Sequence, residues 1–193
     1  MNCALYFGSF NPVHFGHTAI AKYLSEMEEI DKVMIIPSPQ NPLKDTGILA
    51  PAEQRLRQVR KDFCGISDKI EISDIEYHLE KPLYTIRTLQ KLQEIHPDYN
   101  LILTIGADNI LIIEKWAQWR EILSNYEIIV YPRDGYDCVT KCMELAPICK
   151  KLTYLEDAPL LKISSTQIRE GKRLKSTTNP DTDVNTSDFS KTI

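Results

Sequence analysis

The sequence has no long apolar run, no excess of basic residues and no paired cysteine pattern, and each absence excludes a class of protein. No apolar segment is long enough to span a bilayer and no signal peptide opens the chain, so we expect neither a membrane span nor secretion. The net charge is −4, whereas a nucleic-acid binder is normally basic, so DNA or RNA is not expected as a partner. The five cysteines are scattered and odd in number, which is typical of reduced thiols in a cytoplasmic protein.

Two common phosphate-binding motifs are also missing, namely the GxGxxG fingerprint and the GxxxxGK[ST] loop. The 193 residues nevertheless suit one domain with a sizeable core. Short apolar runs alternate with helical segments, and this alternation predicts a mostly parallel α/β sheet with right-handed crossovers. The predicted strands are residues 3–7, 32–36, 69–72, 99–105, 127–131 and 151–155.

The stretch CALYFGSFNPVHFGH, residues 3–17, is the most informative part of the chain. A buried strand leads to Gly8 and a turn-rich loop, and a helix is expected from Thr18. Such a junction directs backbone N–H groups and a helix dipole at an anion, with phosphate favoured, and Gly8 lets a ligand approach the backbone. His14 and His17 can both face one ligand. The pattern also fits an ordinary α/β turn, or half of a zinc site without an obvious complement.

Gly106 and Asp108 follow the strand predicted at 99–105. A glycine and an aspartate at this end of a parallel strand lie where open α/β sheets hold ligands, and the aspartate can accept ribose hydroxyls. A helix N-cap is an equal alternative for Asp108. Further along, Trp116 and Trp119 are three residues apart in a short helical stretch. Such a pair usually belongs to the core, although one tryptophan facing the crevice would offer a flat platform for a ring.

Two further segments contain candidate anion ligands. The irregular loop at residues 37–51 is long, as functional loops often are, and it contains Lys44. Lys44 is a candidate anion ligand, and the alternative is an ordinary solvated loop lysine. The segment ISSTQIR, residues 163–169, begins with a capping-box pattern. Its hydroxyl residues, together with Arg169, would also form an anion site at a helix start. These hydroxyl residues are Ser164, Ser165 and Thr166.

GSFNPVHFGH and ISSTQIR together resemble the HxGH and ISSTxIR motifs of the nucleotidylyltransferase superfamily. This resemblance implies a Rossmann-like, doubly wound α/β fold with helices on both faces of the sheet. PSPQNPLK, LYTIRTL and IGADN followed by a tryptophan narrow the resemblance to the bacterial nicotinate-nucleotide adenylyltransferases. We therefore expect a nucleotidylyltransferase domain over residues 1–175 and a polar, flexible tail over residues 176–193.

The resemblance implies transfer of AMP from ATP to nicotinate mononucleotide, giving deamido-NAD and pyrophosphate, with Mg²⁺ accompanying ATP. The catalytic residues that it implies are His14, His17 and Lys44. ATP would be bound by Gly8, Ser9, Phe10, Gly16, His17, Gly106, Asp108, Ser164, Ser165, Thr166 and Arg169. Nicotinate mononucleotide would be bound by Lys44, Thr85, Trp116 and Arg133. No protein metal site is implied, and a homo-oligomer is left open.

Three alternatives remain open at this point. The first is the same chemistry on nicotinamide mononucleotide or phosphopantetheine, the second is a non-catalytic nucleotide sensor, and the third is a zinc-binding module built on His14 and His17. The chain also departs from the family pattern at Ser9 and Asn11 in the first loop, at Leu43, at Arg87, and in the polar tail after Lys175.

Overall fold

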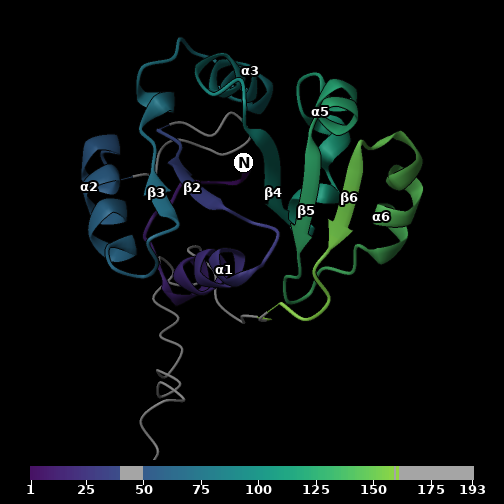
Figure 1. The fold of residues 1–193 in the computed structure, drawn as a ribbon, viewed down its shortest axis with the longest axis horizontal. Coiled ribbons are helices and arrows are strands. Elements are labelled where there is room, and N and C mark those ends of the chain that lie inside the picture. The colour runs from purple at the N-terminus through teal and green to yellow at the C-terminus, as the bar shows by residue number, and fades with distance from the viewer. Residues whose placement is uncertain (40–49, 159, 161–193) are drawn as a thin grey trace, which may run out of the picture.

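The computed structural model describes residues 1–39, 50–158 and 160, in which strands and helices alternate along the chain (Figure 1). The strands are β1 (Asn2–Gly8), β2 (Lys32–Pro37), β3 (Ile70–Ile72), β4 (Asn100–Gly106), β5 (Glu127–Tyr131) and β6 (Lys151–Tyr154). The α-helices are α1 (Phe15–Glu26), α2 (Ala52–Phe63), α3 (Thr85–Ile95), α4 (Ala107–Ile110), α5 (Trp119–Asn125) and α6 (Val139–Leu145). Short 3₁₀ helices are η2 (Ile75–Tyr77), η3 (Ile113–Lys115) and η4 (Ala146–Ile148).

The described strands form one sheet in the order β3-β2-β1-β4-β5-β6, and every pair of neighbours is parallel. The chain runs outward from β1 to β3, then crosses to β4 and runs outward to β6. The direction of winding therefore reverses between β1 and β4, and the carboxyl ends of these two strands lie side by side at this switch point. All six predicted strands are confirmed, each within one residue of its predicted bounds.

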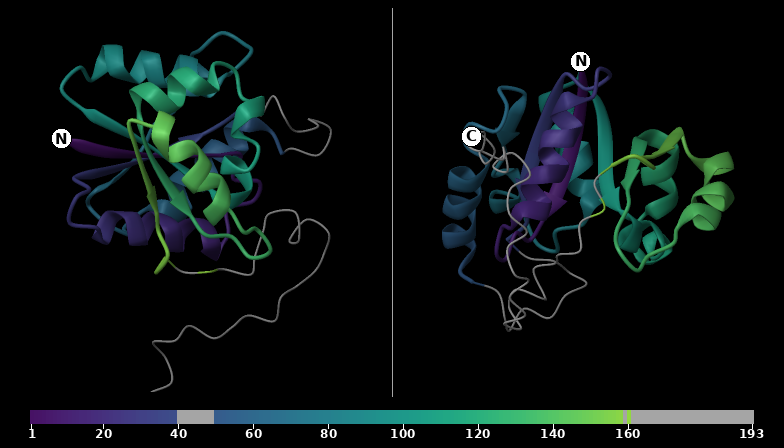
Figure 2. Two further views of the ribbon diagram at one scale, coloured as in Figure 1. Left: turned by 90° about the vertical axis from the view of Figure 1, so that its right-hand side faces the viewer. Right: turned by 90° about the horizontal axis from the view of Figure 1, so that it is seen from below.

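Alternate residues of the four central strands, β2, β1, β4 and β5, enter two separate cores, as the two-residue period of a strand requires. On one face, Leu5 and Leu103 pack with apolar side chains of α3, α4, α5 and α6. On the other face, Tyr6 and Ile35 pack with side chains of α1 and α2. Figure 1 shows α1 on one side of the strands and α3 and α5 on the other, and Figure 2 shows α1 running alongside the sheet. The doubly wound fold with helices on both faces is thus confirmed.

Helix α1 begins at Phe15, three residues before the predicted start at Thr18. The N-cap is His14, whose backbone is extended at φ −146° and ψ 168°. Histidine is not among the residues that favour N-caps, so no local signal in the sequence marks this start. The earlier start places His17 in the first turn of the helix, next to the switch point.

One smaller expectation was wrong. Trp116 and Trp119 do not share a helix, because Trp116 is the C-cap of η3 and the left-handed backbone of Gln118 (φ 52°) separates it from α5. Within the described ranges, no helix combines the length and apolar character that crossing a membrane would need.

Candidate active site

The loop after β1 is held from inside by the ring of Phe10. This residue is 1% exposed and has a left-handed backbone (φ 43°), a conformation that costs a non-glycine residue energy unless packing maintains it. Its ring meets those of Tyr6 and Phe63 edge to face at 5.7 Å and that of His17 at 4.9 Å. A Cβ at Gly8 would lie 2.8 Å from the Phe10 ring, so only glycine fits there. The ring of Phe10 therefore supports the loop from the core, and its predicted part in binding ATP stays a prediction.

His14 and His17 lie together at the start of α1. Their rings stack with centroids 3.7 Å apart and planes 25° apart. The backbone N–H of His14 donates to Nδ1 of His17 at 3.2 Å. Since Nδ1 of His17 accepts this bond, neutral His17 carries its proton on Nε2, and the ring is held in one tautomer. Gly16, also predicted to bind ATP, lies between the two histidines in the sequence and is buried in the first helical turn.

The two ring nitrogens of His14 are buried and have no hydrogen-bond partner within residues 1–39, 50–158 and 160. Burial, and secondarily the positive charge of Arg133, lowers the pKa of His14 from 6.5 to about 4. The ring is therefore neutral at neutral pH. An anion placed against it would supply an acceptor for its N–H and would raise its pKa, so His14 is suited to a phosphate ligand.

Asp108 and Arg133 are paired across the ends of β4 and β5. Nη1 of Arg133 donates to Oδ2 of Asp108 at 2.9 Å, and both side chains keep about a third of their surface exposed (31% and 27%). The pair closes over Gly106, where a Cβ would lie 2.5 Å from Oδ1 of Asp108 and 2.9 Å from Cδ of Arg133. The N-cap of α4 is Gly106, so the alternative that Asp108 caps this helix is wrong.

Arg133 connects the two sides of the switch point. It begins a tight turn after β5, in which the N–H of Tyr136 donates to its carbonyl at 3.1 Å and Gly135 adopts φ 82°. Its guanidinium contacts Asp108 and is also close enough to lower the pKa of His14. Residues predicted to bind the nucleotide, His14 after β1 and Asp108 after β4, therefore both lie near Arg133.

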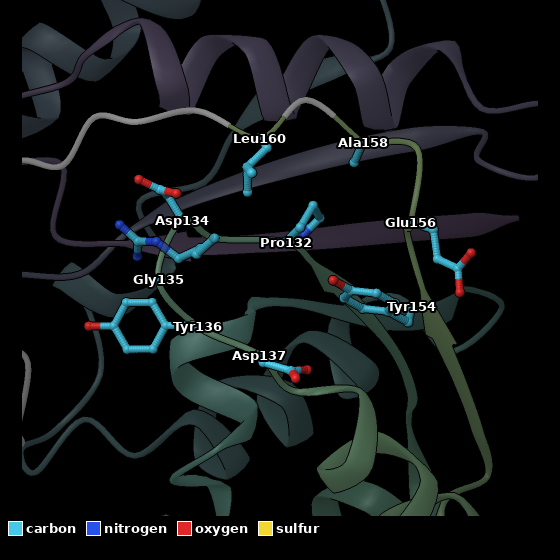
Figure 3. Close-up of a pocket in the computed structure, with 10 residues that line it drawn as sticks. Pro132, Asp134, Gly135, Tyr136, Asp137, Tyr154, Glu156, Ala158 and Leu160 are labelled. Atoms are coloured by element: carbon cyan, nitrogen blue, oxygen red, sulfur yellow. The ribbon is translucent and has the colours of Figure 1, made fainter.

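An open hollow of about 540 Å³ lies past the ends of β5 and β6 (Figure 3). Its wall includes Arg133 and the aromatic rings of Tyr136 and Tyr154. Its volume is within the range of small-molecule sites. Its carboxylates make it poorly suited to a polyphosphate and better suited to a group that donates hydrogen bonds. These carboxylates belong to Asp134, Asp137 and Glu156.

The remaining predicted phosphate ligands lie outside the described residues. They are Lys44, Ser164, Ser165, Thr166 and Arg169. The tail at residues 176–193 lies outside as well. Their part in the site therefore stays a prediction.

The described part of the chain offers no metal-ligand cluster. No group of three or more histidine, cysteine, aspartate or glutamate side chains within it could hold a metal ion. Cys138 and Cys142 are buried in the core, with their sulfur atoms 3.9 Å apart. A zinc module built on His14 and His17 therefore finds no complementary ligands among the described residues.

Residues 5–171 match the family model described as cytidylyltransferase-like. A protein of Porphyromonas gingivalis named a probable nicotinate-nucleotide adenylyltransferase is 40% identical over 183 residues, which cover 91% of this chain and 88% of the relative. One of the same name from Bacteroides fragilis is 40% identical over 166 residues, covering 86% and 79%. This chain belongs to the nicotinate-nucleotide adenylyltransferases of the cytidylyltransferase-like family. The Plasmodium falciparum nicotinic acid mononucleotide adenylyltransferase, solved in complex with NaAD, shares the fold, with a TM-score of 0.75 and 21% identity over 88% of this chain and 82% of that one.

Thr85 and Trp116, which were expected to bind nicotinate mononucleotide, lie on separate elements. Thr85 is the first residue of α3 and is partly exposed. Trp116 is the C-cap of η3, and its half-buried ring packs against the core on the α3–α6 side of the sheet. The indole Nε1–H is buried and has no partner among the described residues. Because buried donors are normally bonded, this N–H marks a place where a ligand acceptor would be stabilising.

Sequence reasoning missed Arg55, a buried arginine of α2 that contacts the loop after β1. It is 3% exposed and donates to the carbonyl of Ser9 at 2.6 Å. A signal was present in the sequence: Arg55, Val59 and Phe63 are four residues apart and therefore share one stripe of the helix, and the other two are apolar. A charged residue in an apolar stripe indicates a specific buried partner.

Proposed function

We propose that this chain transfers AMP from ATP to nicotinate mononucleotide, giving deamido-NAD and pyrophosphate as a step of NAD biosynthesis. The observation that carries the proposal is the His14 and His17 stack at the switch point, with Arg133, the partner of Asp108, close enough to lower the pKa of His14. The 40% identity to relatives named for this activity supports the choice of acceptor.

The chemistry needs positioning more than it needs a base. A phosphate monoester has a second pKa of about 6, so the mononucleotide phosphate is mostly a dianion at neutral pH. One of its oxygens attacks the α-phosphorus of ATP, and the bond from that phosphorus to the oxygen bridging the α and β phosphates breaks. Pyrophosphate leaves with the electron pair. The protein must hold the reactants in line and stabilise the charge on the phosphoryl oxygens.

His17 is suited to that stabilisation, because the bond from the His14 backbone holds its ring in one orientation and in the tautomer with the proton on Nε2. His14 offers a second, neutral donor from a half-buried ring whose nitrogens are covered, and it gains a proton more easily once a phosphate lies beside it. We assign both to the ATP phosphates. Lys44 and the segment with Ser164, Ser165, Thr166 and Arg169 complete the proposed phosphate site by neutralising the charge of the departing pyrophosphate.

Mg²⁺ is proposed to accompany ATP without a ligand set in the protein. Two imidazoles and the guanidinium of Arg55 lie at the loop after β1, and the carboxylate of Asp108 is already bonded to Arg133. Mg²⁺ prefers oxygen ligands and keeps several waters, so triphosphate oxygens and water suit it better than these residues. Its contribution is to neutralise charge on the phosphoryl oxygens.

For the acceptor, we assign Trp116 to the pyridine ring, the start of α3 at Thr85 to the nicotinate carboxylate, and Arg133 to the phosphate. Arg133 has five N–H donors, of which the bond to Asp108 uses one, so a phosphate can be added without breaking the pair. Asp108 in turn is proposed for the ribose of ATP. Donors directed at a carboxylate would disfavour a carboxamide, which presents its own N–H groups, and this predicts a preference for nicotinate over nicotinamide mononucleotide.

The proposed setting is the cytoplasm. All five cysteines are free thiols in the structure, which supports a reducing compartment.

The test is a coupled assay of pyrophosphate release with ATP and each acceptor in parallel. We expect the highest kcat/KM with nicotinate mononucleotide, exceeding that with nicotinamide mononucleotide by at least about tenfold. A higher kcat/KM with nicotinamide mononucleotide or phosphopantetheine would reassign the acceptor. ATP binding without pyrophosphate release from any acceptor would favour the nucleotide sensor and contradict the proposal.

A further inference from the structure

A single buried guanidinium, that of Arg55, joins three segments next to the candidate active site. Its Nη1 donates to the carbonyls of Ser9 at 2.6 Å and Ser38 at 2.7 Å. Its Nη2 donates to the carbonyl of Pro39 at 2.8 Å, and its Nε donates to that of Ala50 at 3.1 Å. Ser9 belongs to the loop after β1, Ser38 and Pro39 follow β2, and Ala50 precedes α2. The guanidinium therefore fixes where these three backbones lie relative to one another.

Two further hydrogen bonds connect the loop after β1 to the same two segments, the one after β2 and the one before α2. The N–H of Ser38 donates to the carbonyl of Gly8 at 2.8 Å, which extends the pairing of β1 and β2 beyond the strands. The side-chain oxygen of Asn11 accepts the N–H of Ala50 at 3.3 Å, and Asn11 is 6% exposed. The loop that leads to His14 is thus tied to the same neighbours at Gly8, Ser9 and Asn11.

Burying the charge of Arg55 costs free energy, so the hydrogen bonds that its guanidinium donates must offset that cost. All four acceptors are neutral carbonyls, and no carboxylate within the described ranges forms an ion pair with it. Burial lowers the pKa of Arg55, as expected when the charged form loses solvent. An apolar side chain would fill the stripe shared with Val59 and Phe63 without that cost, but it would leave four carbonyls without this donor.

We propose that Arg55 is a positioning residue for AMP transfer: by holding the Ser9 carbonyl against the segment after β2, it sets the place of the His14 and His17 pair. The contact to the reacting phosphates is made by the histidines, and Arg55 acts through the loop. The inference rests on the proposed function for its kinetic part only, because the geometry of the two histidines can be measured without catalysis.

The first test compares Arg55→Lys with Arg57→Lys. Lysine keeps the charge and the apolar stem, but one ammonium group cannot reproduce the planar fork that reaches carbonyls of three segments. We expect Arg55→Lys to lower kcat by about ten- to a hundredfold, with a smaller rise in KM for ATP, because small displacements of positioning groups have effects of this size. Arg57 lies on the same helix and is exposed, so Arg57→Lys should leave kcat and KM unchanged.

The second readout is the ¹⁵N spectrum of the histidine side chains, recorded on the same proteins without substrate. The wild type and Arg57→Lys should show His17 with Nδ1 unprotonated and hydrogen-bonded, and Arg55→Lys should lose this signature. If the wild type releases no pyrophosphate, the proposed function fails while the spectrum still tests the positioning role. A folded Arg55→Lys with wild-type kcat, or with the wild-type His17 signature where no catalysis is found, would overturn the inference.

If Arg55→Lys does not fold, Arg55→Ala with added guanidinium chloride decides the matter, with sodium chloride as the control. Guanidinium can occupy the vacated position and donate to the same carbonyls. Return of the His17 signature with guanidinium alone, accompanied by kcat if the wild type is active, is the expected result. A fold restored without that signature, or no recovery of either, would overturn the inference.

Discussion

Replacing Gly106 by alanine tests whether the Asp108 and Arg133 pair positions the nucleotide. The added Cβ would lie 2.5 Å from Oδ1 of Asp108, whereas ordinary contacts begin at 3.4 Å, so the carboxylate must withdraw by about 0.9 Å. Arg133 Cδ, at 2.9 Å, must also move. The backbone at Gly106 (φ −78°, ψ 160°) is open to alanine, so the perturbation is steric and acts first on the pair, with Cε2 of Tyr131 the next neighbour at 3.2 Å.

The expected effect on activity is larger than the effect on stability. Overpacking of this kind costs about 1–3 kcal/mol, and a partly exposed ion pair contributes at most about 1 kcal/mol. In contrast, a displacement of about 1 Å in a positioning group lowers turnover by up to about a hundredfold. We therefore expect Gly106→Ala to lower kcat/KM by about ten- to a hundredfold, measured as the initial rate of pyrophosphate release, while denaturant unfolding shows a folded protein.

Gly65→Ala is the matched control. Gly65 precedes β3, at the opposite end of the sheet from the candidate site, and a Cβ there meets nothing within 4 Å. Its φ of 75° makes alanine strained by about 1–2 kcal/mol, so stability falls by a similar amount without any contact to the site. Wild-type kinetics in Gly106→Ala, or an equal loss of kcat/KM in both variants, would refute the positioning role of the pair.

Three further predictions concern the histidines and the tryptophan. His17→Ala should lower kcat by about a hundred- to a thousandfold with the circular dichroism spectrum retained, and near-normal turnover would remove His17 from the site. Trp116→Ala should raise the KM for nicotinate mononucleotide more than that for ATP in steady-state assays, and the opposite pattern would refute the stacking role. The pKa of His14 is about 4 in the folded protein and 6.5 as its ordinary value, so the unfolded chain binds more protons between these values. The free energy of unfolding should therefore fall as pH drops from 6.5 to 4, by about 1–2 kcal/mol for this partly solvated ring. His14→Gln should flatten that slope in denaturant titrations, and an unchanged slope would contradict the burial argument.

The sheet could be predicted from the sequence because its strands are buried on both faces. A parallel strand covered by helices on both sides appears as a continuous apolar run, and EIIVY gives β5 at Glu127–Tyr131 without error. The order of the runs then leaves few topologies, and the switch point follows from them. The same reasoning located Gly8 and Gly106 at the ends of two strands, and the structure shows that these strands, β1 and β4, are neighbours.

The partnerships inside the site could not be predicted in the same way. Asp108 and Arg133 each had a separate predicted ligand, and their pairing depends on β4 and β5 being neighbours and on Gly106 leaving space beneath them. Phe10 was assigned to ATP because it lies within the motif, whereas its left-handed backbone turns the ring into the core. The position of Arg55 in an apolar stripe of its helix indicates a buried partner. Its acceptors, however, are backbone carbonyls of segments distant in the sequence, and the sequence pattern does not show which carbonyls they are.

The central claim is that an oxygen of the mononucleotide phosphate displaces pyrophosphate from ATP. Phosphorus NMR of a reaction mixture of ATP, Mg²⁺, nicotinate mononucleotide and the protein tests it most directly. The account predicts that the monophosphate signal disappears in step with ATP, while one dinucleotide diphosphate and one pyrophosphate appear for each ATP consumed. Consumption of ATP to AMP and pyrophosphate with the mononucleotide signal unchanged, or formation of ADP, would contradict it.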